Sequence, residues 1–166
     1  MQSSRGRHVV DYQNLNSCGS YCDDYIHLKM PTRFNEDPCV DTGGTTGCST
    51  ISDMFHIHVT GYAYGVPSVI DITFVGYVTP QSNGGPLRKT KVFDATSTSC
   101  DTSVNPAGGT YQGCAIYHGS DGALYLRFKP NSLYHIAFSV DSMYVGNGYV
   151  LKRNDIEVVL DAGASR

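Results

Sequence analysis

Apolar and polar side chains alternate without interruption in the stretch Phe55-His56-Ile57-His58-Val59-Thr60. Successive side chains of a β-strand point to opposite faces of the sheet, so this spacing predicts a strand with one buried face and one more polar face. The same period of two returns at residues 70–75, 124–129, 134–141 and 156–161. No segment sustains the apolar spacing of an amphipathic helix. The chain is therefore expected to be all-β.

Turn residues separate these runs, as an antiparallel fold requires. Residues 65–68 (GVPS) and 129–132 (KPNS) divide neighbouring strands, and Asn147-Gly148 is a strong signal for a tight turn. Shorter strands are expected at residues 25–30 and 89–93. About eight or nine strands with hardly any helix predict an antiparallel β-sandwich of the jelly-roll type.

Length and composition agree with a single β-rich domain. The chain has 166 residues, of which 40% are hydrophobic and 16% charged, with 18 Gly and 12 Tyr. A net charge of -3 is unlike that of a basic nucleic-acid-binding domain. No apolar run approaches the ~20 residues of a membrane span. We expect an N-terminal arm at residues 1–24 and the β-sandwich at residues 25–166, with neither nucleic-acid binding nor membrane insertion.

Six cysteines lie in segments rich in Gly, Ser, Thr, Asp and Asn: Cys18, Cys22, Cys39, Cys48, Cys100 and Cys114. Buried structural thiols prefer apolar strands, so cysteines in polar segments indicate disulfide bonds or a metal. Cys39 is close enough in sequence to pair with Cys48. Cys100 is likewise near Cys114. Disulfide bonds predict an extracellular protein on the surface of a virion or a cell.

The cysteines at positions 18 and 22 leave two alternatives open. They either close a tight ring or pair across to Cys39 and Cys48. A structural zinc site commonly uses two C-x2–4-C pairs, and the sequence offers one such spacing, Cys18-x3-Cys22. Disulfide bonds are therefore the favoured interpretation.

Four segments, taken in order, carry a pattern known from another group of proteins. They are residues 25–31 (YIHLKMP), 54–65 (MFHIHVTGYAYG), 70–77 (IDITFVGY) and 121–128 (DGALYLRF). Their order resembles the C-terminal receptor-binding tip domain of trimeric phage and viral tail fibres and of related fibre-like surface adhesins. The resemblance implies a homotrimeric fibre tip that displays loops to a receptor. Phage tips generally lack cysteines, so the cysteines here favour a virus of eukaryotes or a surface adhesin.

Long polar tracts at residues 31–52 and 80–113 are the expected recognition loops. Loops of such length in a compact domain usually carry function. Tyrosine supplies rigid contact area with a polar tip, which suits binding surfaces. Tyr111 and Tyr117 flank Cys114 and are the first candidates for receptor contact. The strand faces around Tyr62 and Tyr64 are the second.

His56 and His58 place two imidazoles on one face of one strand, which is half of a metal site. A third ligand would come from His27, His118 or His135, and the chain would then be a small metal-dependent enzyme. A polar strand face also accounts for the two histidines, and a two-residue motif is frequent by chance. We therefore expect no metal, no cofactor and no catalysis.

Together these patterns predict a non-catalytic domain that recognises a receptor or a glycan on a host or prey cell. The alternatives are the metal-dependent enzyme and a structural shell or decoration protein that only assembles. An oligomeric mass separates a trimeric tip from a monomeric enzyme.

Overall fold

The computed structural model describes residues 7–14, 25–31, 34, 53–63, 68–81, 88–97, 114–129, 135–142 and 151–161. Within these ranges the chain forms nine strands and no α-helix. In this part of the chain there is accordingly no helix of the length and apolarity that a membrane crossing needs.

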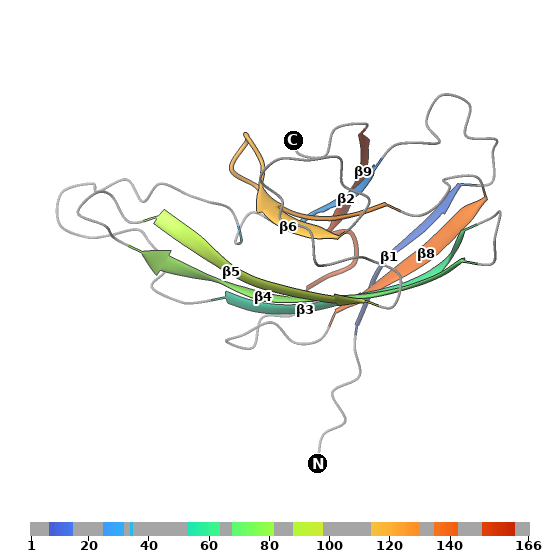
Figure 1. The fold of residues 1–166 in the computed structure, drawn as a ribbon, viewed down its shortest axis with the longest axis horizontal. Coiled ribbons are helices and arrows are strands. Elements are labelled where there is room, and N and C mark those ends of the chain that lie inside the picture. Colours follow the sequence, from blue (N-terminus) through green and yellow to red (C-terminus); the bar gives the residue numbers. More distant parts are fainter. Residues whose placement is uncertain are drawn as a thin grey trace, which may run out of the picture.

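The strands form two antiparallel sheets. The five-stranded sheet, called the large sheet below, has the order β1 (Arg7–Asn14), β8 (Ile136–Ser142), β3 (Asp53–Ala63), β4 (Ser68–Gln81) and β5 (Arg88–Ser97). The four-stranded small sheet has the order β6 (Ala115–His118), β7 (Leu124–Phe128), β2 (Tyr25–Lys29) and β9 (Glu157–Asp161). Figure 1 shows the large sheet as a long curved layer with the small sheet above it. The all-β class is confirmed, and the arrangement is consistent with a β-sandwich.

Apolar side chains from both sheets form one core between them. On β3 the alternation read from the sequence is confirmed, because Phe55, Ile57 and Val59 are buried. The ring of Phe128 on β7 meets that of Phe138 on β8 edge to face, with centroids 5.5 Å apart. This contact joins the small sheet to the large one. Burying side chains of this size stabilises the fold by about 1.5–3 kcal/mol each.

The first strand of the domain precedes the expected one. Residues 7–14, assigned by sequence to an arm, form β1 and pair antiparallel with β8 at the edge of the large sheet. Val10 and Tyr12 are partly buried and pack on the core. The Tyr12 ring stacks on Phe138 at a centroid distance of 5.0 Å. Two inward side chains are too short a pattern to stand out in the sequence, which is why this strand was not predicted.

β4 and β5 extend into the tract expected to be a loop. β4 continues through Pro80 to Gln81, and β5 covers residues 88–97 where a strand was expected only at residues 89–93. β4 and β5 pair over ten positions, from Ile72 with Ser97 to Gln81 with Arg88. Proline cannot donate to the ladder and is confined in sheets to edges and strand ends, as at Pro80 here. The loop predicted from the turn-forming residues of this tract is therefore too long, because β4 and β5 take up part of it.

Candidate functional site

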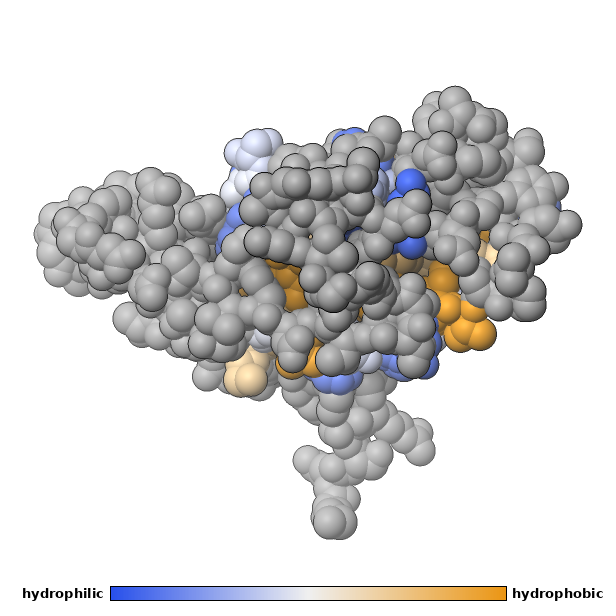
Figure 2. Space-filling view, viewed as in Figure 1, coloured by the Kyte–Doolittle hydropathy of each residue, from blue (hydrophilic) through white to orange (hydrophobic). Residues whose placement is uncertain are grey.

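The outer face of the large sheet, which points away from the core, carries a mixture of polar and apolar side chains. Figure 2 shows orange and blue surface next to each other along the lower edge of the molecule, where this sheet lies. Four large apolar side chains on this face are exposed: Met54 (55%), Tyr62 (54%), Val69 (67%) and Val75 (36%). Such side chains are found at binding surfaces when they gather with polar ones.

A groove opens on this face beside Tyr62. The strand register pairs Gln13 of β1 with Ala137 of β8, and Ala137 with Tyr62 of β3, so the three residues form one row across the sheet. Ala137 ends at Cβ, and the longer side chains on both sides rise above it. The hollow, called the Tyr62 groove below, has a volume of about 410 Å³. Ligand pockets have volumes of about 300–1,000 Å³, so this groove is large enough for a small ligand.

The adjacent row adds polar groups to the walls of the groove. Asp11 of β1 lies opposite Ser139 of β8, which lies opposite Thr60 of β3. The Thr60 and Ser139 hydroxyls share a hydrogen bond of 3.3 Å between their oxygens. Asp11 and Thr60 both line the groove. One wall therefore offers a carboxylate and an amide, and the other an aromatic ring and a hydroxyl.

A close approach of β3 and β8 supports the floor of the groove. A Cβ atom added at Gly61 would lie 2.1 Å from the carbonyl oxygen of Ala137 and 2.6 Å from Cα of Phe138. Both atoms belong to the backbone, so only glycine permits this packing. Phe138 in turn stacks on Tyr12, and burial raises the pKa of the Tyr12 phenol. The groove is thus built on three hydrogen-bonded strands over packed aromatic rings.

The two histidines of β3 share the outer face of the large sheet, as the sequence predicted. His58 Nε2 lies 2.7 Å from Asp71 Oδ1 of β4, and this pair is solvent-exposed. The described residues contain no cluster of three or more His, Cys, Asp or Glu side chains able to hold a metal. Of the expected third ligands, His27 lies buried in the small sheet, and His118 Nε2 lies 3.1 Å from the carbonyl oxygen of Phe34.

On the outer face of the small sheet, by contrast, several aromatic and basic side chains are buried. Tyr117 of β6 stacks on Tyr125 of β7 at a centroid distance of 5.5 Å. The Tyr117 hydroxyl and His27 Nδ1 share a hydrogen bond of 2.6 Å. The guanidinium of Arg127 lies over the ring of Tyr25, 4.8 Å from its centroid. These five residues are called the small-sheet cluster below.

Tyr117 belongs to this packed cluster and offers little exposed surface to a receptor. Only 6% of Tyr117 is accessible, because its ring is stacked and its hydroxyl is bonded. In the sequence Tyr117 follows a polar tract. In the structure it belongs to β6, and its ring packs against that of Tyr125. Tyr62, by contrast, is exposed on the Tyr62 groove. Of the tyrosine candidates within the described residues, Tyr62 alone stands at an open surface.

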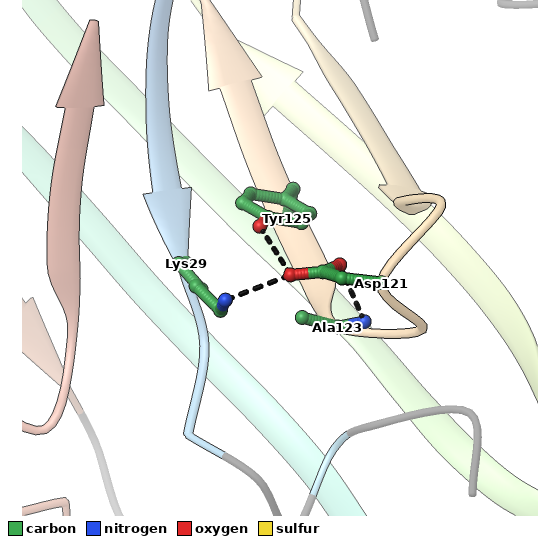
Figure 3. A network of polar contacts seen from close by, with 4 residues as sticks. All are labelled: Lys29, Asp121, Ala123 and Tyr125. Carbon is green, nitrogen blue, oxygen red and sulfur yellow. Dashed lines mark hydrogen bonds and ion pairs between the residues drawn. The ribbon is translucent and has the colours of Figure 1, made fainter. Parts of the chain in front are cut away.

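A polar network closes one end of the small sheet (Figure 3). Asp121 Oδ2 accepts hydrogen bonds from Lys29 Nζ at 2.7 Å and from the Tyr125 hydroxyl at 2.9 Å, and Oδ1 accepts one from the Ala123 amide. The hydrogen bond from Lys29 lowers the pKa of Asp121 to about 2. Gly122 follows with φ 74°, a left-handed conformation that glycine adopts without strain. The network fixes the turn between β6 and β7.

Several predicted site residues lie outside the described residues. They are Tyr64, Tyr111, Cys18, Cys22, Cys39, Cys48 and Cys100. Cys114, the one described cysteine, is disulfide-bonded, and its partner lies outside the described ranges. The expected pairing of Cys114 with Cys100 therefore remains a prediction.

Sequence reasoning missed most of the Tyr62 groove. Asp11 and Gln13 lie in the segment that the sequence predicts to be an arm, and Thr60 and Ala137 occupy ordinary positions of the predicted alternating strands. The available signal was weak. It consists of one small residue, Ala137, among the outward-facing residues of β8. Recognising it requires the strand order, because Gln13 and Ala137 are far apart in the chain.

No known protein-family model matches the sequence, and the searches of curated proteins and of solved structures found no match.

Proposed function

We propose that this chain is a non-catalytic recognition domain that binds a receptor or a glycan on a cell surface. The observation that carries the proposal is the Tyr62 groove, where an exposed aromatic ring faces Asp11 and Gln13 across the small side chain of Ala137. Binding sites combine apolar contact area with a few placed polar groups, and this groove has both. Its location corresponds to the second recognition surface expected from the sequence, the strand faces around Tyr62.

The rigidity of the groove supports binding. Its walls stand on β1 and β3, and both strands are hydrogen-bonded to β8 between them. A surface that is already ordered loses little conformational entropy when a ligand binds. The residues that line the groove include one carboxylate and neither histidine nor cysteine. Hydrolysis of a glycosidic bond commonly uses two carboxylates, so this set is better suited to holding a ligand than to cleaving one.

We further propose a homotrimer of jelly-roll domains at the tip of a fibre, exposed on a virion or on a cell. This part rests on the order of the motifs in the sequence and on the two antiparallel sheets. A shallow groove binds weakly by itself, and three copies on one fibre would raise the apparent affinity through multivalency. Light scattering in native buffer is expected to give three times the chain mass of 18.0 kDa. A monomeric mass would contradict the trimer.

A cell-binding screen and a glycan array with the full chain test the recognition function. Tyr62→Ala is expected to abolish attachment, because it removes the aromatic wall of the groove. Met54→Ala is the matched control, since Met54 is equally exposed on the same strand and face but does not line the groove. A second variant replaces residues 102–112 with a Gly/Ser linker. Loss of attachment in the linker variant alone would return recognition to the loop that contains Tyr111.

A further inference from the structure

We infer that the Tyr62 groove takes the acetamido group of an N-acetylated sugar. This inference rests on the proposed recognition function and names the class of ligand for the same groove. Three features of the groove point to this group: the row of side chains that forms it, the exposure of its two walls and the distance between them.

One row of three side chains gives the groove its chemistry. Gln13 of β1, Ala137 of β8 and Tyr62 of β3 lie opposite one another in the strand register, and all three line the groove. A carboxamide, a methyl group and an aromatic ring therefore lie side by side. An acetamido group has matching parts, because its amide both donates and accepts hydrogen bonds and its methyl is apolar. The ligand amide can pair with the Gln13 carboxamide while the ligand methyl contacts Ala137 and the Tyr62 ring.

Both walls are accessible to a ligand. Gln13 is exposed, and 54% of Tyr62 is exposed. No hydrogen bond or ion pair to another described residue occupies the Gln13 carboxamide or the Tyr62 hydroxyl. Pairing the carboxamide with a ligand amide therefore exchanges hydrogen bonds with water for hydrogen bonds with the ligand, and no bond within the described part of the chain has to break.

The distance between the walls suits a thin, planar group. The walls stand on β1 and β3, which are separated by β8 alone. Adjacent strands lie about 4.8 Å apart, so the two walls are about 10 Å apart at their backbones. A planar group in van der Waals contact with both walls needs about 7–8 Å between them, because non-bonded carbon atoms meet at about 3.5–4.0 Å. The acetamido plane therefore fits between the walls, and the bulkier sugar ring lies at the rim beside Tyr62.

The shallow shape of the groove favours a sugar over an acetylated protein. The floor is the side chain of Ala137, so the depth of the groove is limited to the lengths of Gln13 and Tyr62. Acetyl-lysine carries its acetamido group on a four-carbon stem, which this groove would leave in water. In an N-acetylated sugar the group is attached to the ring itself, whose apolar C–H face then packs on the aromatic ring of Tyr62.

A peptide backbone is a poor match for the floor of the groove. The backbone groups of β8 already pair with β1 on one side and with β3 on the other. A peptide that binds by adding a strand needs an unpaired sheet edge, and β8 does not provide one. Contacts in the groove are therefore made by side chains, which suits a compact group such as an acetamide.

Saturation-transfer NMR on the full chain tests this assignment with sugars that differ in the acetamido group alone. N-acetylglucosamine is compared with glucose, and N-acetylgalactosamine with galactose. At least one N-acetylated sugar is expected to bind, and its acetyl methyl is expected to receive the strongest saturation. It is expected to bind about tenfold or more tightly than the sugar with a hydroxyl in that position, because it gains a methyl contact and an amide hydrogen bond.

Two variants locate the acetamido group in the groove. Ala137→Leu fills the floor and is expected to weaken binding of the N-acetylated sugar by about tenfold or more. Gln13→Leu removes the amide pairing and is expected to weaken binding by about threefold to tenfold, as for one net hydrogen bond. Met54→Ala is the control and is expected to leave the affinity unchanged, since Met54 is exposed but does not line the groove.

Thermal unfolding of each variant shows whether it retains the fold. Gln13 is exposed on β1, at the edge of the large sheet, so Gln13→Leu keeps the test usable if Ala137→Leu unfolds.

The outcomes separate this inference from the proposed function. N-acetylated sugars that bind no more tightly than their parent sugars would overturn the inference, and the proposed function would stand if cell attachment still depends on Tyr62. A preference for N-acetylated sugars that is unchanged in both Ala137→Leu and Gln13→Leu would also overturn it and place the sugar site elsewhere. Binding of Nε-acetyl-lysine without binding of either N-acetylated sugar would overturn it and point to an acetylated protein. Cell attachment that is unaffected by Tyr62→Ala would instead contradict the proposed function.

Discussion

Large side chains on the outer face of the large sheet are open to solvent, whereas the small-sheet cluster on the corresponding face of the small sheet is buried. On β8 the side chains alternate between buried and half-buried along the whole strand. On β7 all five side chains are buried, although Leu124-Tyr125-Leu126-Arg127-Phe128 reads as an alternation in the sequence. The alternation of residue types is the same in both strands. What differs is whether the second set of side chains is buried.

The small-sheet cluster shows how polar residues become interior ones. Tyr, His and Arg carry apolar atoms as well as polar ones, and they can be buried when the polar ends are bonded. Tyr117 and His27 bond to each other, and Arg127 lies over Tyr25. On the large sheet the outward positions of β8 hold the short residues Ala137, Ser139 and Asp141, which cannot build such a layer. One face is therefore suited to stability, and the other remains available for a ligand.

The largest expected effect comes from removing matched tyrosines from the two faces. Tyr125→Ala is expected to lower the free energy of unfolding by about 3–5 kcal/mol, as for other large aromatic side chains removed from a core. Only 2% of Tyr125 is accessible, and its ring stacks on Tyr117. Tyr62→Ala is expected to change stability by less than about 0.5 kcal/mol, because it is a surface substitution. Urea titration measures both values, and equal losses would remove the distinction between the faces.

A second substitution tests the inner side of the large sheet, beneath the Tyr62 groove. Gly61→Ala is expected to cost about 2–3 kcal/mol, because the new Cβ would meet backbone atoms of β8 that cannot move aside cheaply. Thr73→Ala on the outer face of β4 is the control and is expected to cost less than about 1 kcal/mol. Gly61→Ala is also expected to weaken ligand binding by spreading β3 and β8. Parent-like stability in Gly61→Ala would show that the sheet adjusts at this point.

Removing a single hydroxyl tests the polar contacts of the small-sheet cluster. Tyr117→Phe deletes the oxygen that lies 2.6 Å from His27 Nδ1 and leaves that nitrogen without this partner. Loss of a buried hydrogen-bond partner costs about 1–3 kcal/mol, so a decrease of that size in the unfolding free energy is expected. Tyr62→Phe on the open face is expected to have no measurable effect on stability. Identical denaturation curves for parent and Tyr117→Phe would mean that the bond contributes only to geometry.

The smallest effect concerns pH at the edge of the small sheet. The folded-state pKa of Asp121 is lowered from its ordinary 3.8 to about 2, mainly by the hydrogen bond from Lys29. A lowered carboxyl pKa contributes stability above the unfolded pKa, and this contribution is lost as the pH falls from about 4 through 2. Because 44% of the Asp121 side chain is exposed, we expect less than about 1 kcal/mol.

Asp121→Asn is the control for this pH dependence. Asparagine can still accept the bond from the Ala123 amide, but it carries no charge. The variant is expected to be slightly less stable than the parent at neutral pH and to converge with it near pH 2. A difference that persists unchanged at low pH would show that the ionisation of Asp121 does not contribute. Unfolding by urea at a series of pH values gives both curves.

The alternation in residues 55–60 and 134–141 was sufficient to predict β3, β8 and the all-β class, because each of these strands has one buried face and one solvent-accessible face. The same reasoning failed for the outer side of β7, where burial depends on which side chains pack on one another. β1 was missed because its pattern is short. The Tyr62 groove was missed because it joins residues of β1, β3 and β8, whose adjacency follows from the strand order and from no local pattern.

The strand order also affects when the chain can fold. Arg7 pairs with Ser142, and Tyr25 pairs with Asp161, so early strands of both sheets find partners near the other end of the sequence. Contacts between residues so far apart in sequence slow folding, because a long loop must close before they form. On the ribosome, β1 and β2 are made well before β8 and β9 can join them. Unpaired strands are prone to aggregate, so the yield of native protein is expected to depend on chaperones and on low concentration during synthesis.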